Sequence, residues 1–175
     1  FGSVATTNAL EPFINAIEIS FKKRLPLKFT IVGSGDNFKE YERRLNKVNS
    51  VEIKSKISHS LIFKEMEKCD LLFLSTHKSN IWNYGQSMNK IVDYMLASKP
   101  ILAMYSGLPS MINESKCGEF IPHCSSEELL SIFMEYSNKS KRELKLIGKN
   151  GFEWLKSNHS YSKLAKDYYE QLKQL

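Results

Sequence analysis

The sequence has few of the residues that mark disulfide-rich, metal-binding or disordered chains. It holds three cysteines, Cys69, Cys117 and Cys124, an odd number without a Cys-x-x-Cys pair. That pattern disfavours a disulfide framework and a zinc ribbon, and free thiols in a reducing cytosol are the simpler interpretation. Eight glycines and five prolines among 175 residues are too few for a low-complexity or disordered chain. No apolar run approaches the ~18 residues that cross a bilayer.

Arginine is also scarce. Four of the 25 basic residues are Arg and the remaining 21 are Lys, in a chain whose net charge is +6. Proteins that read bases and phosphates favour Arg, because its planar guanidinium binds in a bidentate way. We therefore expect no nucleic-acid partner. The basic clusters at 22–24 and 139–149 are as compatible with a weak, peripheral contact with an anionic membrane surface as with nucleic-acid binding.

The chain is long enough to bury one hydrophobic core. It has 175 residues, 42% of them hydrophobic, and a domain of this size buries about 70% of its unfolded surface. We expect residues 1–175 to form a single domain. The sequence begins at Phe1 inside an apolar stretch, without Met and without a secretory leader. This pattern favours a chain cut at a strand, with a preceding part of the protein missing.

Short apolar runs alternate with segments of helical periodicity. Strands are expected at 1–5, 27–32, 51–53, 70–75, 101–104 and 118–121. Helices are expected at 10–21, 38–48, 61–68, 89–97, 125–136, 141–155 and 161–175. Apolar strands separated by helices are typical of a parallel sheet covered on both faces. We therefore predict an α/β fold: a Rossmann-like, doubly wound parallel sheet of about six strands with helices on both faces.

Ligands of such sheets bind outside the carboxyl ends of the strands. The loops expected at those ends are 2–9, 33–38, 54–60, 75–89 and 105–112. In the second of them, Gly33-Ser34-Gly35 follows a strand and precedes a helix, so its N–H groups are able to face an anion. A dinucleotide fingerprint needs a third glycine where this chain has Phe38, and a plain tight turn is the simpler interpretation.

The stretch from Tyr84 to Lys90 carries more information. It runs into the start of an expected helix, where free N–H donors and the helix dipole attract a phosphate. Gly85 permits a close backbone approach, Ser87 adds a hydroxyl and Lys90 adds a positive charge. Because a cation in the first turn opposes the helix dipole, a bound anion explains Lys90 better than a role in local stability.

Asp93 follows Lys90 by three residues and shares its helix face. Its carboxylate suits the two vicinal hydroxyls of a ribose beside that phosphate. An ordinary first-turn Asp, or an ion-pair partner of Lys90, is an equally good interpretation. His59 and His77 also fall in candidate loops, where exposed polar residues are the default. No catalytic residue is assigned.

The segment 84–102, Tyr-Gly-Gln-Ser-Met-Asn-Lys-Ile-Val-Asp-Tyr-Met-Leu-Ala-Ser-Lys-Pro-Ile-Leu, resembles the donor-site signature of the GT-B glycosyltransferases of family 4, or group 1. It is most similar to the bacterial branch that builds capsule and O-antigen polysaccharides. Further segments resemble the C-terminal domain of that family, in the same order: 1–4, 27–36, 51–57, 70–75 and 118–122. The resemblance therefore covers nearly the whole chain.

The resemblance implies the donor-binding half of a GT-B enzyme, without its N-terminal acceptor domain. The implied reaction is retaining transfer of a glycosyl group from a UDP- or GDP-sugar to a lipid-linked or oligosaccharide acceptor in surface polysaccharide biosynthesis. No cofactor and no obligatory metal are implied, and this chain alone is expected to be inactive. The implied location is the cytoplasm, with peripheral binding to the inner face of the cytoplasmic membrane kept open.

The resemblance also implies which residues bind the nucleotide sugar. They are Gly2, Ser3, Asn8, Gly33, Ser55, Lys56, Ile57, Gly85, Gln86, Ser87, Met88, Asn89, Lys90 and Asp93. Within this set, the nucleobase is expected near Ser55–Ile57, the diphosphate near Ser87–Lys90 and the ribose at Asp93.

The chain departs from the family pattern at charged positions. The two acids of the usual Glu-x7-Glu pair are Gly85 and Asp93 here, so the acid that faces the transferred sugar is missing. The usual Arg and Lys of the first loop are Ser3 and Asn8, which removes two phosphate-binding cations. Lys90 is our candidate for the residue that replaces this charge.

Two functions of other classes compete with the transferase. A non-catalytic nucleotide-binding module of the same architecture is favoured by the missing charges. A receiver-like signalling domain would need an acidic cluster near its first strand and a phosphorylatable Asp after its third. Neither feature is present in the sequence, so this second alternative is disfavoured.

Overall fold

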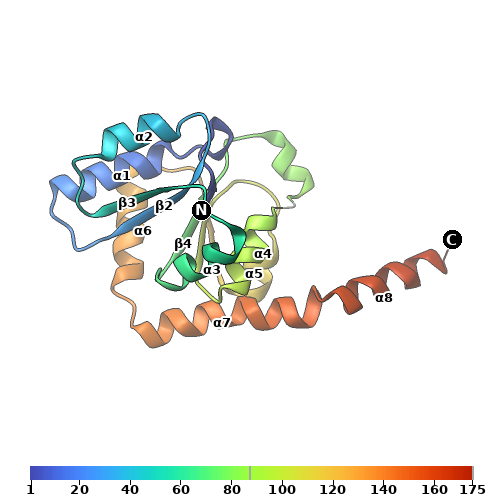
Figure 1. Ribbon diagram of the computed structural model, residues 1–175. Helices are drawn as coiled ribbons and strands as arrows, with labels where there is room; N and C mark the ends of the chain where they lie inside the picture. The colour runs from blue at the N-terminus through green and yellow to red at the C-terminus, as the bar shows by residue number, and fades with distance from the viewer. Residues whose placement is uncertain (87, 175) are drawn as a thin grey trace.

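Strands and helices alternate along residues 1–86 and 88–174, the part of the chain that the computed structural model describes. The strands are β1 (Gly2–Ser3), β2 (Phe29–Ser34), β3 (Val51–Ser55), β4 (Leu72–Ser75), β5 (Ile101–Met104) and β6 (Gly118–Ile121). The α-helices are α1 (Glu11–Lys22), α2 (Phe38–Leu45), α3 (His59–Glu67), α4 (Asn89–Leu96), α5 (Met111–Ser115), α6 (Ser126–Ser137), α7 (Lys141–Asn158) and α8 (Tyr161–Leu172). Two 3-10 helices are η1 (Thr6–Asn8) and η2 (Asn80–Tyr84). The predicted alternation is confirmed (Figure 1).

The six strands pair in parallel and form two sheets of three strands, β1-β2-β3 and β4-β5-β6. In the first sheet, Gly33 of β2 lies opposite both Gly2 and Ser55. The predicted Rossmann-like α/β fold with about six parallel strands is confirmed, whereas the expected single sheet is divided in two. The division lies beside β1, because this strand has only two residues and pairs with only the end of β2.

Helices cover both faces of the sheets, as the side chains of β5 demonstrate. Leu102 and Met104 belong to one buried cluster, together with side chains of α1, α2 and α6. Ile101 and Ala103 point the other way, into a second cluster that includes side chains of α3, α4 and α5. β5 is therefore buried on both faces, and this is why its sequence is apolar throughout.

Serine caps set the starts of the later helices. The Ser125 hydroxyl accepts a hydrogen bond from the Glu128 N–H, and the Glu128 carboxylate accepts one from the Ser125 N–H. This is the capping box expected from the sequence, and Ser140 and Glu143 repeat it at α7. The short elements η2 and α5 were not predicted, because five residues are too few to display a helical period.

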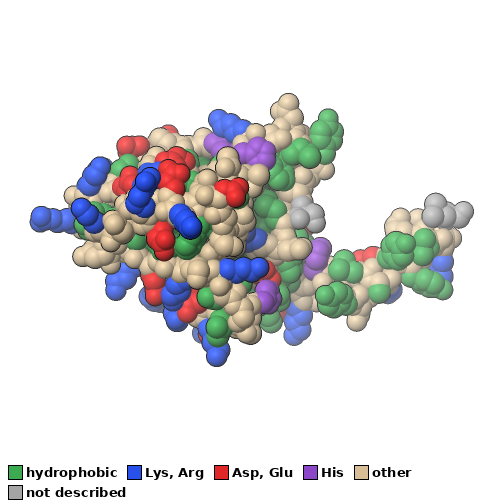
Figure 2. All heavy atoms as spheres, turned by 45° about the horizontal axis from the view of Figure 1, so that its top comes forward, with side chains coloured by type: hydrophobic (Ala, Val, Ile, Leu, Met, Phe, Trp, Pro, Cys, Tyr) green, Lys and Arg blue, Asp and Glu red, His purple; other side chains and the backbone are tan. Residues whose placement is uncertain are grey.

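The last helix, α8, projects from the body of the molecule (Figure 1). No residue of α8 is buried within the described part of the chain. Its exposed apolar side chains include Tyr161, Leu164, Tyr168 and Leu172, whose spacing places them on one face. Hydrophobic side chains, in green, are visible on the projecting helix in Figure 2. Among the described helices, none combines the length and the apolar character needed to span a membrane.

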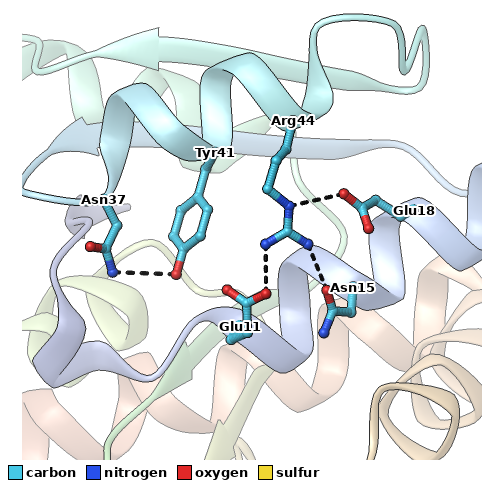
Figure 3. A network of polar contacts seen from close by, with 6 residues as sticks. All are labelled: Glu11, Asn15, Glu18, Asn37, Tyr41 and Arg44. Atoms are coloured by element: carbon cyan, nitrogen blue, oxygen red, sulfur yellow. Dashed lines mark hydrogen bonds and ion pairs between the residues drawn. The ribbon is translucent and has the colours of Figure 1, made fainter.

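A polar network joins α2 to α1 (Figure 3). The Arg44 guanidinium donates hydrogen bonds to the Glu18 carboxylate at 3.1 Å, the Glu11 carboxylate at 2.5 Å and the Asn15 side-chain oxygen at 2.6 Å. The three acceptors share one face of α1. The hydrogen bond to Glu18 is the main reason why the pKa of Arg44 lies above its ordinary value. The network therefore fixes α2, which follows the Gly33–Gly35 turn, against α1.

Replacing Arg44 with alanine is expected to lower the free energy of unfolding by about 1 kcal/mol, or Tm by about 2–4 °C. The effect is modest because the carboxylate partners are exposed to water, Glu11 by 53% and Glu18 by 29%, and water screens the ion pairs. Arg43→Ala, at the exposed neighbouring position, is the matched control and is expected to change stability by less than about 0.5 kcal/mol. Urea unfolding measures both variants. If Arg44→Ala unfolded at the same urea midpoint as the parent chain, the network would contribute nothing to stability.

Candidate functional site

The Lys90 side chain lies next to Gly2 of β1. A Cβ atom placed on Gly2 would lie 3.2 Å from Lys90 Cε and 3.6 Å from Lys90 Nζ. Gly2 also has φ of +108°, which L side chains rarely adopt. A larger residue at this position would therefore strain the backbone and crowd the lysine. The sequence predicted both residues as ligand contacts, and the fold brings them together although they belong to different elements.

The Lys90 ammonium is a partly shielded cation. Its side chain is half-buried, and this burial lowers the pKa of the ammonium group. Among the described residues, no carboxylate forms an ion pair with it. Asp93, the partner of Lys90 in one interpretation of the sequence, lies 3.7 Å from Nε2 of His59 instead. Because desolvation disfavours the charged form, an anion bound here would both stabilise the ammonium and raise its pKa.

The first turn of α4 places further positive charge next to Lys90. The N-cap residue of α4 is Met88, which has no side-chain acceptor for the N–H groups of the first turn. The Ile91 N–H bonds the Met88 carbonyl at 2.9 Å, whereas the N–H groups of Asn89 and Lys90 come too early in the helix to have an intrahelical partner. The helix dipole adds partial positive charge at this end. Asn89, the first helical residue, is exposed. The start of α4 therefore presents donors and Lys90 presents a full charge from the same turn.

Gln86 supplies another unused donor in the segment before α4. Its side-chain oxygen accepts a hydrogen bond from the Met88 N–H at 3.1 Å. Its Nε2 group is shielded from solvent and has no hydrogen-bond partner within the described part of the chain. Gly85 precedes it at the end of η2. Ser87, the hydroxyl expected to contact phosphate, lies outside the described residues.

Asp93 faces the start of α3. One carboxylate oxygen of Asp93 lies 3.7 Å from Nε2 of His59, the first residue of α3. The Asp93 side chain is 33% exposed and that of His59 is 71% exposed, so both remain accessible to a ligand. Asp93 thus lies near the helix that follows the Ser55–Ile57 segment. The approach of His59 to Asp93 was missed because nothing in the sequence indicates which carboxylate this histidine meets.

Three of the predicted residues form a row across the first sheet. Gly33 lies between Gly2 and Ser55, with which it pairs. A Cβ atom on Gly33 would lie 1.8 Å from the Gly2 carbonyl oxygen, so glycine is required for β1 to approach β2 this closely. Lys56 and Ile57 follow directly after β3, the first exposed and the second half-buried. The structure thus places both residues at the end of β3, where the nucleobase is expected.

Asn8 is used inside its own loop. Its side-chain amide donates a hydrogen bond to the Ser3 carbonyl at 2.7 Å, and its backbone carbonyl accepts one from the Ser75 hydroxyl. The His77 N–H also bonds the Thr7 carbonyl, at 3.2 Å. These contacts fix the loop after β1 against the end of β4. Asn8 therefore positions the loop, whereas the exposed Ser3 remains open to solvent.

The loop before Gly85 is held by one carbonyl group. The Trp82 carbonyl accepts hydrogen bonds from the Tyr105 hydroxyl and the Leu108 N–H, both at 3.0 Å. The Trp82 indole N–H donates to the His77 carbonyl at 2.8 Å. A polar stretch that the sequence indicated only as a loop is thus anchored to the segment after β5. The signal available in the sequence was the aromatic Trp82 inside a polar run.

The chemistry that these side chains offer is the binding of an anion and of a hydroxyl-bearing group. Lys90, the first turn of α4 and the Gln86 amide provide positive charge and donors, and Asp93 provides an acceptor. Gly85 stands where the resemblance predicts an acid, and a Cβ atom there would meet nothing within 4 Å. In the described part of the chain, no group of three or more His, Cys, Asp or Glu side chains is arranged to hold a metal.

A family model described as glycosyl transferases group 1 matches residues 1–136. No curated protein gives a significant match. The similar solved structures include the C-terminal domain of the glycosyl transferase group 1 family protein LpcC from Francisella tularensis, with a TM-score of 0.68 and 18% identity. That match covers 92% of this chain and 84% of the LpcC domain.

Two longer proteins have the same fold over this region. A mutant of S. aureus TarM, solved with Fondaparinux, alpha-GlcNAc-glycerol and UDP, has a TM-score of 0.75 and 17% identity over 97% of this chain and 34% of its own. Anabaena Alr3699/HepE, solved with UDP-glucose, has a TM-score of 0.71 and 18% identity over 99% of this chain and 48% of its own. This chain therefore spans between a third and a half of the length of these two proteins.

Proposed function

The chain belongs to the glycosyl transferases group 1 family, and from this premise we propose that it binds a nucleoside-diphosphate sugar as the donor-binding part of a transferase. The observation that carries the proposal is the half-buried Lys90 ammonium at the first turn of α4, next to Gly2. A diphosphate bound there would receive the lysine charge and the free N–H groups of the helix.

The remaining parts of the donor fit the surrounding residues. From a diphosphate at Lys90, the ribose would reach Asp93, whose carboxylate would accept hydrogen bonds from the two vicinal hydroxyls. The nucleobase would lie toward Ser55–Ile57, near the start of α3. UDP is the favoured nucleotide, because TarM and HepE, which share the fold, were solved with UDP and UDP-glucose respectively.

In the proposed reaction, an acceptor hydroxyl oxygen bonds to the anomeric carbon as the bond from that carbon to the diphosphate breaks. The hydroxyl proton leaves with the diphosphate, whose negative charge Lys90 and the α4 dipole would stabilise. We propose retention at the anomeric carbon, a lipid-linked or oligosaccharide acceptor and a role in surface polysaccharide biosynthesis. We also propose that neither a cofactor nor a metal is required and that acceptor binding needs an N-terminal domain, without which this chain transfers nothing.

The proposed location is the cytoplasm, with peripheral contact at an anionic membrane surface.

A second candidate function, a nucleotide-binding module without transferase activity, is favoured by three residues. Gly85 takes the place of an acid, and Ser3 and Asn8 take the places of two cations. Asn8 is moreover engaged with the Ser3 carbonyl. Transfer by the full-length protein would exclude this alternative, whereas nucleotide binding without transfer would establish it.

Titration of UDP, GDP and ADP, followed by Tm, tests the proposed function on this chain. We expect UDP or GDP to raise Tm more than ADP, by an amount that grows with ligand concentration. Asp93→Asn is expected to weaken the preferred nucleotide about tenfold, because a charged acceptor for the ribose hydroxyls is lost. Asp167→Asn, in an ion pair on the projecting α8, should change nothing. No shift with any nucleotide at millimolar concentration would contradict the proposal.

A further inference from the structure

His59 and Asp93 face each other from two different helices beside the candidate nucleotide site. His59 is the first residue of α3, and Asp93 belongs to α4. Nε2 of His59 lies 3.7 Å from one carboxylate oxygen of Asp93. This separation is longer than the range of about 2.7–3.2 Å that is usual for an N–H···O hydrogen bond. The two groups are therefore close enough to share a ligand atom, but they are not bonded to each other.

The packing of α3 against α4 fixes this arrangement. Met66 of α3 belongs to the same buried cluster as Ile91 and Tyr94 of α4, and the two helices lie side by side (Figure 1). The His59 ring also meets the ring of Phe63, one turn later on α3, edge-on with their centres 5.5 Å apart. The imidazole and the carboxylate thus project from packed helices, as a preorganised binding contact requires.

The start of α3 does not need an imidazole for its own stability. The N-cap residue Ser58 accepts no hydrogen bond from the helix, and its hydroxyl contacts the Ser60 hydroxyl at 3.1 Å instead. The Leu61 N–H bonds the Ser58 carbonyl, whereas the N–H groups of His59 and Ser60 come too early to have an intrahelical partner. Acceptors and negative charge stabilise such a helix end. As at Lys90, a ligand that supplies an acceptor explains the residue better.

A hydroxyl group is the partner that an imidazole and a carboxylate recognise together. A hydroxyl donates one hydrogen bond and accepts others, a carboxylate only accepts, and an imidazole donates through Nε2 in the tautomer that carries its hydrogen there. An oxygen atom about 2.8 Å from each of two atoms that are 3.7 Å apart satisfies both. Such a hydroxyl would donate to Asp93 and accept from His59. A hydrogen atom in its place would lose both bonds.

The side of Asp93 on which His59 lies indicates which ribose hydroxyl it meets. His59 follows Ser55–Ile57, the segment beside the expected nucleobase, whereas Lys90, beside the expected diphosphate, precedes Asp93 by three residues on α4. In a ribose, the 2′-carbon is bonded to the carbon that carries the nucleobase, and the 3′-carbon lies toward the phosphate arm. His59 is therefore on the side of the 2′-hydroxyl.

We propose, on the basis of the function proposed above, that His59 selects ribonucleotides: its Nε2–H donates to the 2′-hydroxyl, which in turn donates to the Asp93 carboxylate. The donor is then a ribonucleoside-diphosphate sugar rather than a deoxyribonucleoside-diphosphate sugar. A sealed site built around a hydroxyl rejects the analogue that lacks it by about 10⁴-fold or more. The His59 and Asp93 side chains are 71% and 33% exposed, so water replaces part of the lost contact and we expect a preference of about 10- to 100-fold.

The test measures the Kd of UDP and of 2′-deoxy-UDP for the parent chain and for His59→Ala by isothermal titration calorimetry. His59→Ala should bind UDP about tenfold more weakly than the parent chain does. Its affinity for 2′-deoxy-UDP should change less than about twofold, because that ligand has no hydroxyl for His59 to contact. The affinity for 3′-deoxy-UDP should fall about tenfold, as that for UDP does. His59 is exposed, so its replacement leaves the core intact.

Two further variants and a spectroscopic signal separate this contact from a general effect. His59→Gln keeps a side-chain N–H donor and is expected to recover part of the UDP affinity. His159→Ala removes an exposed imidazole at the end of α7 and should change neither affinity. The ring proton signals of His59 should move on saturation with UDP and move less with 2′-deoxy-UDP.

Equal losses of affinity for UDP and 2′-deoxy-UDP in His59→Ala, or no loss for either, would overturn the assignment of His59. A 3′-deoxy-UDP affinity that does not respond to His59→Ala would overturn it as well. These results would leave the proposed function standing, provided that UDP binding depends on Lys90. A parent chain that binds no UDP would contradict the proposed function and the role of His59 together.

Discussion

Replacing Lys90 with glutamine is expected to weaken UDP binding by about 10- to 100-fold. Hydrogen bonds that involve charged groups contribute about 1.5–3 kcal/mol, and each 1.4 kcal/mol is a factor of ten in affinity. We expect a loss of affinity near the upper end of this range, because Lys90 is half-buried and no described carboxylate pairs with it. Glutamine retains a hydrogen-bond donor and removes the charge. Isothermal titration calorimetry measures the change.

The matched control is Lys64→Gln, which removes one charge from an exposed position on α3. This variant should bind UDP as the parent chain does.

The pH dependence of UDP binding gives a second test of the role of Lys90. Burial lowers the pKa of Lys90. UDP should therefore bind with its full affinity at pH values where Lys90 is protonated, and the affinity should fall as pH rises through that lowered pKa. Lys90→Gln should show no such fall. Equal losses in Lys64→Gln and Lys90→Gln would mean that only the net charge matters.

Replacing Gly148 with alanine is expected to destabilise the fold by about 2 kcal/mol, or to lower Tm by about 4–8 °C. A Cβ atom on Gly148 of α7 would lie 2.0 Å from the Ser98 carbonyl oxygen and 2.8 Å from Lys99 Cα. Both atoms belong to the backbone after α4, so they cannot rotate away. Alanine gains about 1 kcal/mol in helix propensity, but the enforced separation of α4 and α7 outweighs this gain.

Lys149→Ala is the matched control for Gly148→Ala, because residue 149 is the exposed neighbour on the same helix. It should alter stability by less than about 0.5 kcal/mol. Denaturant unfolding of both variants measures the difference. A Gly148→Ala protein as stable as the parent would mean that α7 does not pack against the end of α4 as closely as described.

The regular elements were predictable where local chemistry agrees with the fold. Ile101–Met104 is apolar throughout because both faces of β5 are covered, and Lys99-Pro100 separates it from α4. The start of α6 was predictable from Ser125 and Glu128, since a capping box acts within four residues. The division of the sheet was not predictable, because the apolar stretch 1–5 carries no information on how many residues find partners.

The candidate site was predictable in part. Gly2 and Lys90 were both predicted to contact the nucleotide sugar, and the fold brings them together, whereas ligand binding itself stays a prediction. The approach of His59 to Asp93 depends on the packing of α3 beside α4 and has no local signal in the sequence. The hydrogen bond from the Asn8 side-chain amide to the Ser3 carbonyl likewise has no local signal in the sequence. Contacts between distant residues require the assembled fold, whereas helix caps and apolar strands do not.

Amide chemical shifts recorded during a UDP titration test directly whether the start of α4 and Lys90 hold a nucleoside diphosphate. We expect the largest shifts at Gly2, Asn89 and Lys90, with smaller ones along Ser55–Ile57. Signals of β6 and α8 should not move. Binding of the diphosphate at this site would be contradicted if millimolar UDP left the amide signals of Gly2 and Lys90 unchanged, or if the shifts gathered at another edge of the fold.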